Sequence, residues 1–112
     1  SPESVIQNSL ISEGCNIEGH IDFSVLFAGV TIEPGAVVRD SIIMPNTTIK
    51  KGAVVEYAIV GEDCVIGENV KVGARPESIE DKDTWGVAVI GHGVTVSDNA
   101  EIKPKAMISA DV

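Results

Sequence analysis

Two histidines are the residues of this chain best suited to acid–base chemistry, because an unperturbed imidazole titrates near neutral pH. They are His20 and His92, the only histidines in 112 residues. Both fall in short polar breaks between apolar segments, where a structural role in a turn is the simpler interpretation. No nucleophile elbow, phosphate-binding glycine loop or zinc-binding cysteine pair accompanies them. The sequence therefore predicts no catalytic residue, no metal site and no cofactor-binding residue in this chain.

Four cations are the candidates for binding an anion. Lysine and arginine hold phosphate and carboxylate groups through charge-assisted hydrogen bonds. The four that the repeat described below places outward are Arg39, Lys50, Lys51 and Lys71. We interpret them as contacts for an effector or another anion, and the simpler alternative is that they only keep a solvated wall soluble.

The segment 74–85, ARPESIEDKDTW, is rich in charge and ends in the only tryptophan. It interrupts an otherwise regular pattern, which predicts a protruding loop. Arginine and tryptophan are favoured anchors of protein interfaces, so Arg75 and Trp85 are candidates for a contact with another domain or subunit. The alternative is that Trp85 folds back on the wall of its own domain.

The pattern that this loop interrupts is a repeat of fifteen to seventeen residues, which is typical of a solenoid. Its copies begin at Ser9, Ser24, Ser41, Ala58 and Ala88. Large apolar residues recur in each copy and predict three inward columns: Ile11, Leu26, Ile43, Val60 and Ile90; Ile17, Ile32, Ile49, Ile66 and Val96; and Phe23, Val38, Val55, Val72 and Ile102. Smaller residues lie between them, in two further columns: Cys15, Val30, Thr47, Cys64 and Val94; and Ile21, Ala36, Ala53, Val70 and Ala100.

The two cysteines share one of the small columns, three coils apart. Like residues of successive coils are spaced at roughly 4.8 Å, so Cys15 and Cys64 should lie about 14 Å apart. A disulfide needs Cα atoms closer than about 7 Å. We therefore expect two buried thiols.

Two columns of dipeptides separate the apolar segments. They are Glu13-Gly14, Ala28-Gly29, Pro45-Asn46, Glu62-Asp63 and His92-Gly93, and then Gly19-His20, Pro34-Gly35, Lys51-Gly52, Glu68-Asn69 and Asp98-Asn99. The second member is always Gly, Asn, Asp or His, the residues that best tolerate positive φ. Short strands joined by tight turns, about three to a coil, predict a triangular parallel β-helix.

Composition restricts the partners of this domain. A net charge of −9 argues against nucleic acid and against an anionic membrane surface. No segment has the roughly 20 apolar residues of a spanning helix, and no signal peptide is present, so we expect a cytoplasmic protein. The missing initiator methionine and the uncovered strand edges of a solenoid predict a fragment whose ends are covered by another domain or subunit.

The six-residue units VGEDCV (60–65) and IGENVK (66–71) resemble hexapeptide-repeat proteins. That resemblance, and not the spacing, implies a left-handed coil. The expected fold is all-β: a single-stranded left-handed parallel β-helix of about five coils over residues 1–112, with one protruding loop at 74–85.

A more specific resemblance covers almost the whole chain. Two segments resemble the C-terminal domain of glucose-1-phosphate adenylyltransferases. The first is 24–73, which includes SVLF and DSIIMPN, and the second is the Arg-Pro-Glu loop that leads into GVAVIG (86–91). This family joins ATP and glucose 1-phosphate into ADP-glucose and pyrophosphate with Mg²⁺, for glycogen synthesis. The resemblance implies that catalysis, ATP and Mg²⁺ belong to an N-terminal nucleotidyltransferase domain outside this chain, which alone should be inactive.

The same resemblance implies a regulatory and oligomerisation domain, in a parent enzyme that forms a tetramer and responds to a phosphorylated metabolite. Plant members use lysines at two positions that align with Glu62 and Gly93, so that effector site is not retained here. Two alternatives stay open. One is a stand-alone hexapeptide acyltransferase that uses an acyl-CoA, with His20 or His92 as general base, and the other is the β-helix domain of a sugar nucleotidyltransferase that uses GTP or UTP.

Overall fold

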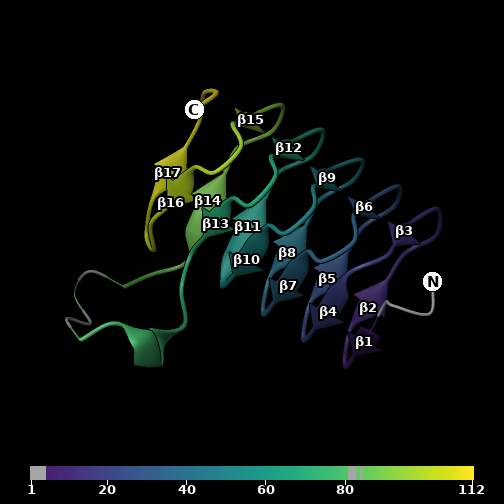
Figure 1. The fold of residues 1–112 in the computed structure, drawn as a ribbon, viewed down its shortest axis with the longest axis horizontal. Coiled ribbons are helices and arrows are strands. Elements are labelled where there is room, and N and C mark those ends of the chain that lie inside the picture. The colour runs from purple at the N-terminus through teal and green to yellow at the C-terminus, as the bar shows by residue number, and fades with distance from the viewer. Residues whose placement is uncertain (1–4, 81–82, 84) are drawn as a thin grey trace.

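The computed structural model describes residues 5–80, 83 and 85–112, and these coil into a parallel β-helix with three flat walls (Figure 1). Sheet A stacks the strands β1 (Val5–Gln7), β4 (His20–Asp22), β7 (Val37–Arg39), β10 (Val54–Glu56), β13 (Lys71–Val72) and β16 (Glu101–Ile102). Sheet B stacks β2 (Leu10–Ile11), β5 (Val25–Leu26), β8 (Ile42–Ile43), β11 (Ala58–Val60), β14 (Ala88–Ile90) and β17 (Met107–Ile108). Sheet C stacks β3 (Asn16–Ile17), β6 (Thr31–Ile32), β9 (Thr48–Ile49), β12 (Val65–Ile66) and β15 (Thr95–Val96).

Each coil contributes one strand to every sheet, in the order B, C, A. Five complete coils run from β2 to β16, and β1 and β17 extend the stack to about six turns. Every strand pairing is parallel and joins like positions of successive coils, such as Ile32 with Ile49. The all-β solenoid predicted from the repeat is confirmed.

The core is a narrow column of aliphatic side chains, as the repeat predicts. The inward residues of the middle coils are fully buried, among them Leu26, Ile43, Val60, Ile32, Ile49, Ile66, Val38, Val55 and Val72. Smaller buried residues stand between them, including Val30, Thr47, Cys64, Ala36, Ala53 and Val70. Burying one such Val, Leu or Ile contributes about 1.5–3 kcal/mol, so the ladders are the main source of stability.

Backbone conformation at the corners follows the predicted dipeptides in most coils. Positive φ occurs at Gly14, Gly29, Asn46, Asp63 and Gly93 in the first corner column, and at Gly35, Gly52, Asn69 and Asn99 in the second. A third corner column, between sheets A and B, has positive φ at Asn8, Phe23, Asp40, Tyr57 and Gly73. This third set was not predicted.

The first coil departs from the predicted register. Ile21 pairs with Val38 and is buried, whereas Phe23, predicted to point inward, is 60% exposed at a corner with φ +47°. The cause is a shorter second corner: Ile21 follows Ile17 by four positions, whereas Val38 follows Ile32 by six. Gly19 makes the contraction feasible, because a Cβ there would overlap the carbonyl oxygen of Ala36. The predicted turn at Gly19-His20 is therefore wrong, and His20 begins β4.

A ladder of serine hydroxyls supports the third corner. The backbone N–H groups of Ser24, Ser41 and Ala58 donate hydrogen bonds of 3.1, 3.2 and 3.2 Å to the hydroxyl oxygens of Ser9, Ser24 and Ser41. Because Ser24 and Ser41 are buried, these hydroxyls supply acceptors that solvent cannot. The serine that begins a copy of the repeat therefore joins one coil to the next.

The loop between β13 and β14 leaves the stack as predicted and includes the 3₁₀ turn Pro76–Ser78. It projects at the lower left of Figure 1, beside sheet A. The rest of the described chain stays within the coils.

Candidate functional site

The outer face of sheet B is aliphatic on every strand. Because side chains alternate along a strand, the residue before each inward residue points out. In sheet B these outward residues form one row in register: Leu10, Val25, Ile42, Ile59, Val89 and Met107. Leu10 and Met107, at the two ends, are 71% and 80% exposed, and Ile42 in the middle is 38% exposed. We call this row the aliphatic face.

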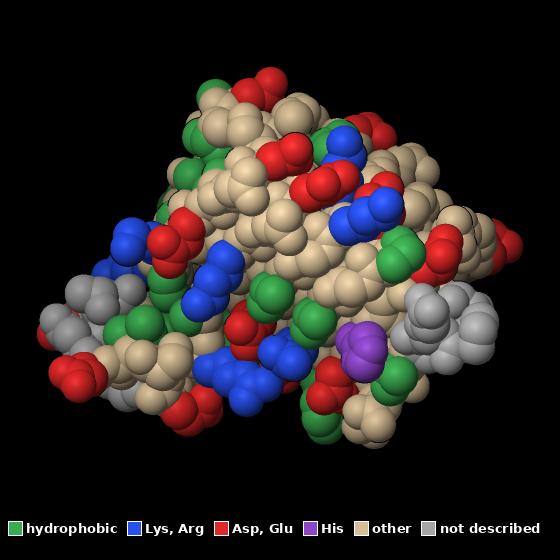
Figure 2. All heavy atoms as spheres, in the orientation of Figure 1, with side chains coloured by type: hydrophobic (Ala, Val, Ile, Leu, Met, Phe, Trp, Pro, Cys, Tyr) green, Lys and Arg blue, Asp and Glu red, His purple; other side chains and the backbone are tan. Residues whose placement is uncertain are grey.

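The other walls lack such a row. The outward residues of sheet C are mostly polar: Asn16, Thr31, Thr48, Val65 and Thr95. Those of sheet A mix valine with polar and charged residues: Val5, His20, Val37, Val54, Lys71 and Glu101. Figure 2 shows charged side chains of both signs interspersed over the face in view. An extended apolar row on one wall only is typical of a docking surface.

Two further apolar side chains extend the aliphatic face. Phe27 and Met44 follow the inward residues of β5 and β8, and Phe27 is partly exposed. The equivalent positions in the next two coils are Gly61 and Gly91, where a Cβ at Gly61 would lie 2.7 Å from the backbone of Gly91. Large side chains thus raise the face beside β5 and β8, whereas glycines leave it flat beside β11 and β14.

Glu56 at the end of β10 is the buried carboxylate of sheet A, and two arginines surround it. Arg75 Nε donates a 3.0 Å hydrogen bond to Glu56 Oε2, and Arg39 Nη1 lies 3.8 Å from the same oxygen. Arg39 is the register neighbour of Glu56, while Arg75 comes from the protruding loop. The loop is therefore attached to sheet A by an ion pair.

Trp85 attaches the other end of the loop. Its Nε1 donates a 2.7 Å hydrogen bond to the Ala74 carbonyl oxygen, and its ring packs edge-to-face on Tyr57 with centroids 5.6 Å apart. Burial, followed by the negative charge of Asp40, raises the pKa of Tyr57. Both predicted partner-contacting residues, Arg75 and Trp85, thus have contacts within this chain, and the side chain of Arg75 is still half exposed.

A pocket of about 500 Å³ lies between this loop and sheet A. Its lining includes the side chains of Lys71, Lys103, Glu101 and Ser78. Lys71 and Glu101 are register neighbours on β13 and β16. Ser78 donates its hydroxyl proton to the Arg75 carbonyl, which leaves its oxygen as an acceptor. Two ammonium groups beside one carboxylate suit an anion that also carries hydroxyl groups.

The other predicted cations lie elsewhere. Lys50 and Lys51 occupy the corner between β9 and β10, where the Lys51 backbone N–H donates to Glu33 Oε1 at 3.2 Å. Arg39 lies on β7 and faces Glu56. Of the four predicted cations, Lys71 lines the pocket together with Lys103, which the sequence did not single out.

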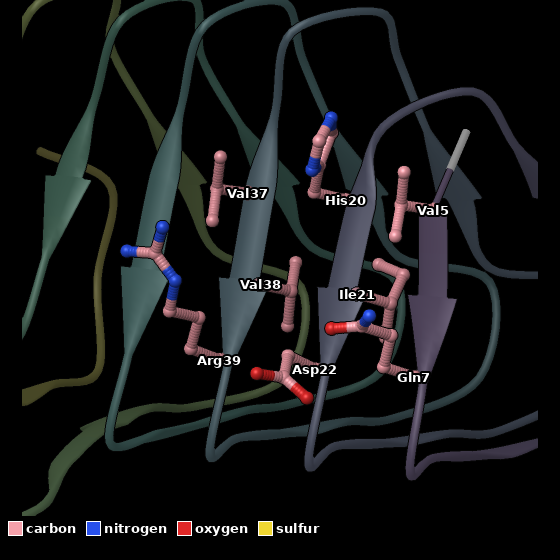
Figure 3. Close-up of a pocket in the computed structure, with 8 residues that line it drawn as sticks. All are labelled: Val5, Gln7, His20, Ile21, Asp22, Val37, Val38 and Arg39. Atoms are coloured by element: carbon pink, nitrogen blue, oxygen red, sulfur yellow. The ribbon is translucent and has the colours of Figure 1, made fainter. Parts of the chain in front are cut away.

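The thiols and imidazoles do not meet. Cys64 is buried and donates to the Gly91 carbonyl at 2.9 Å, and burial raises its pKa. Cys15 is only half-buried, and both thiols are free. His20 borders a small cavity on sheet A (Figure 3), and His92 lies at an exposed corner of the next-to-last turn.

Two absences hold within residues 5–80, 83 and 85–112. No cluster of three or more His, Cys, Asp or Glu side chains has the geometry of a metal site. No helix in this part of the chain is long and apolar enough to cross a membrane.

Comparisons with known proteins agree with this architecture. The model of the family described as "GlmU-like, C-terminal hexapeptide" matches residues 1–97. Glucose-1-phosphate adenylyltransferases of Bacillus thuringiensis and Bacillus anthracis are each 49% identical over 88 residues, which is 79% of this chain but 22% of the relatives. The chain thus spans about a fifth of the length of the curated relatives that it matches. The resemblance to glucose-1-phosphate adenylyltransferases predicted from the sequence is confirmed for this region.

Among solved structures, WeeI from Acinetobacter baumannii aligns with the whole chain and 52% of its own length, at a TM-score of 0.57 and 18% identity. At that identity the likeness shows the fold alone. With the repeat, the three parallel sheets and the family match together, the chain belongs to the GlmU-like C-terminal hexapeptide family, and its fold is the left-handed parallel β-helix.

Proposed function

We propose that this chain is the regulatory and assembly domain of a glucose-1-phosphate adenylyltransferase. The parent enzyme makes ADP-glucose and pyrophosphate from ATP and glucose 1-phosphate, with Mg²⁺, in cytoplasmic glycogen synthesis. The identity to enzymes of that name supports this proposal. Catalysis then belongs to an N-terminal nucleotidyltransferase domain.

The observation that carries the proposal is the aliphatic face. Its six residues span five coil spacings, or roughly 24 Å at the usual strand separation. A row of that length would not remain in water on a domain that functions alone, because burying apolar area is the main driving force of stable association. The occupant that we propose is the nucleotidyltransferase domain of the same chain, since relatives are several times longer than this domain.

The test is a pair of charge insertions in the full-length protein. Ile42→Asp and Ile59→Asp place a carboxylate in the middle of the aliphatic face, and Thr95→Asp places one on the exposed outer face of sheet C as the matched control. We expect the two isoleucine variants to become sensitive to limited proteolysis between the domains and to lose ADP-glucose synthesis, while the control retains both properties.

Sedimentation velocity of the same variants identifies the occupant. We propose that the parent is a homo-oligomer, a tetramer as the family resemblance implies. Loss of oligomers with intact interdomain protection would show that a second copy, and not the nucleotidyltransferase domain, covers the face. Unchanged behaviour in every assay would contradict a docking role.

The lysine pocket is the proposed effector site. A phosphorylated metabolite would place its phosphate between Lys71 and Lys103 and its hydroxyl groups against Glu101. Titration calorimetry of the full-length protein with a sugar phosphate tests this proposal, with Lys71→Ala and Lys103→Ala as the pocket variants and Lys50→Ala as the control. Loss of binding in the first two variants is expected, and an equal effect of the control would exclude the pocket.

The acyltransferase alternative is less well supported. It needs a general-base histidine at a subunit interface, either His20 on β4 or His92 at an exposed corner, whereas the relatives that share 49% identity are named as adenylyltransferases. An assay for acyl transfer from acetyl-CoA separates this alternative from the assembly domain, which should be inactive. The nucleotide of the parent, ATP rather than GTP or UTP, is tested by the products of the full-length enzyme.

A further inference from the structure

The loop wall of the lysine pocket is a compact turn. On the side of the protruding loop, the pocket is lined by Ala74, Ser78 and Ile79. The backbone N–H and the hydroxyl group of Ser78 both donate to the Arg75 carbonyl oxygen, at 3.0 and 2.7 Å. Because these bonds close the turn on itself, the segment 74–79 forms one unit, and contacts outside this unit set its distance from sheet A.

Glu56 ties the unit to sheet A. Its Oε2 accepts the 3.0 Å hydrogen bond from Arg75 Nε. Its backbone carbonyl lies against Gly73, where the loop leaves β13, so closely that a Cβ at the glycine would overlap the oxygen. The lining residues of the pocket do not include Glu56 or Arg75. Each of these side chains therefore acts on a ligand through the position of the loop, or through its charge at a distance.

Trp85 ties the unit to the same corner of the coil. Its indole Nε1 donates to the carbonyl oxygen of Ala74, which lines the pocket. Its ring packs on Tyr57, the residue that follows Glu56 in the chain. The two ties thus end on neighbouring residues, and a ligand that displaces the loop wall must change the surroundings of the Trp85 indole.

We propose that Glu56 and Arg75 are positioning residues of the lysine pocket. Their contact holds the loop wall at the distance from Lys71 and Lys103 at which one phosphorylated metabolite touches both walls. The inference rests on the proposed function for the ligand of the pocket. When a site is formed in only a fraction of the molecules, its apparent affinity is lowered by that fraction. Loss of the tie therefore weakens binding, although neither residue contacts the ligand.

The sign of one charge change separates positioning from direct electrostatics. Glu56→Gln removes a negative charge near the pocket, so Coulomb attraction alone predicts tighter binding of an anion. Loss of the tie to Arg75 predicts weaker binding. We expect the dissociation constant to rise about two- to fivefold, the upper value being the full strength of a partly exposed ion pair.

Titration calorimetry of the full-length protein with ribose 5-phosphate tests the proposal. Arg75→Gln should weaken binding as much as Glu56→Gln, although the two exchanges change the charge in opposite directions. Arg75→Lys, which keeps the charge and a donor, should retain most of the wild-type affinity. Arg39→Gln is the matched control, because Arg39 lies on β7 and removes the same charge beside Glu56 without belonging to the loop. Wild-type affinity is expected in this control.

A spectroscopic readout follows the loop wall directly. Trp85 is the only tryptophan of the 112 residues, and in full-length protein labelled with 5-fluorotryptophan its ¹⁹F resonance is assigned by its absence in Trp85→Phe. Ribose 5-phosphate should shift this resonance in the wild-type protein and in Arg39→Gln, and Lys71→Ala should abolish the shift. Normal binding without a shift would show that the ligand does not contact the loop wall, and would overturn the proposal.

The calorimetric outcomes distinguish this inference from the effector site on which it rests. Unchanged or tighter binding in Glu56→Gln, or an equal loss in Arg39→Gln, would overturn the positioning role. If Lys71→Ala and Lys103→Ala lose binding while Glu56→Gln retains it, the pocket stands and only the positioning role is wrong. If the two lysine variants bind as the wild type does, the effector pocket is wrong and the positioning role falls with it.

Discussion

Arg75 Nε lies 3.0 Å from Glu56 Oε2, and this contact joins the protruding loop to the end of β10. Glu56→Gln removes the charge but keeps the shape. We expect the free energy of unfolding to fall by about 1 kcal/mol, because the Arg75 side chain is 52% exposed and solvent screens the pair. Chemical denaturation measures the loss, and proteolysis within the loop should become faster. The double variant with Arg75→Gln should show little additional loss, since both changes remove the same contact.

Gly52 has φ +70°, and a Cβ there would overlap Oδ1 of Asn69 in the next coil. Gly52→Ala should therefore cost about 2 kcal/mol or more, the left-handed backbone alone accounting for about 1–2 kcal/mol. Thermal unfolding measures the cost. Gly93→Asn is the control, because its φ of +68° suits asparagine and no atom lies within 4 Å of the added Cβ. A large loss in the control would show that backbone conformation is not the cause.

Ile49 is fully buried in the ladder that joins Ile32 to Ile66. Ile49→Ala should lower the free energy of unfolding by about 2–5 kcal/mol, because it opens a cavity in a core only one side chain deep. Urea denaturation gives the value. Ile42→Ala, on the aliphatic face, is the matched control and should cost much less in the isolated domain. Equal losses in the two variants would contradict the assigned inward and outward faces.

Phe23 adopts the left-handed conformation, which is unfavourable for a large side chain, and it is mostly exposed. Phe23→Asn should stabilise this domain by about 0.5–1 kcal/mol, since asparagine tolerates that conformation and little buried area is lost. The melting temperature of the isolated variant would show the gain. If the residue pointed inward, as its sequence column predicts, the same change would instead cost several kcal/mol.

The raised pKa of Cys64 makes stability depend on alkaline pH. Because burial keeps the folded thiol protonated, the unfolded chain loses its proton first, near the ordinary value of 9.0. The stabilisation is complete below that pH and is lost as the pH rises through the folded pKa. Unfolding curves across this range should fall less steeply for Cys64→Ala than for the wild-type chain. Tyr57, whose pKa is also raised, contributes equally to both and cancels in the comparison.

Most of the fold could be predicted from volume and polarity alone. Inward positions of a narrow solenoid accept only aliphatic or small residues, so Ile32, Ile49 and Ile66 revealed the core. The contracted corner of the first coil could not be predicted in this way, because Gly19-His20 has the composition of an ordinary turn. The first copy is two residues shorter than the second, 15 residues from Ser9 to Ser24 against 17 from Ser24 to Ser41. The place of the shortening depends on the close approach of Gly19 to Ala36, which is a relation between coils.

The candidate site was predicted less completely. Charge and loop composition indicated Lys71 and Arg75, but the partners that give them a role, Lys103 and Glu56, depend on the stacking of distant segments. The aliphatic face could also be predicted from the sequence, although the inward columns dominate its apolar pattern. The second residue of each copy is Leu10, Val25, Ile42, Ile59 and Val89, and an outward position that stays apolar through five coils indicates a covered surface.

The regular stacking of the coils has a mechanical consequence. Each coil contacts chiefly its two neighbours, and one copy, 41–57, occupies a complete turn between two others of the same shape. Removing or duplicating that segment would leave every remaining wall continuous and change the height of the column by roughly 4.8 Å. The number of coils therefore sets the distance between whatever binds at the two ends of the domain, independently of the chemistry on its walls.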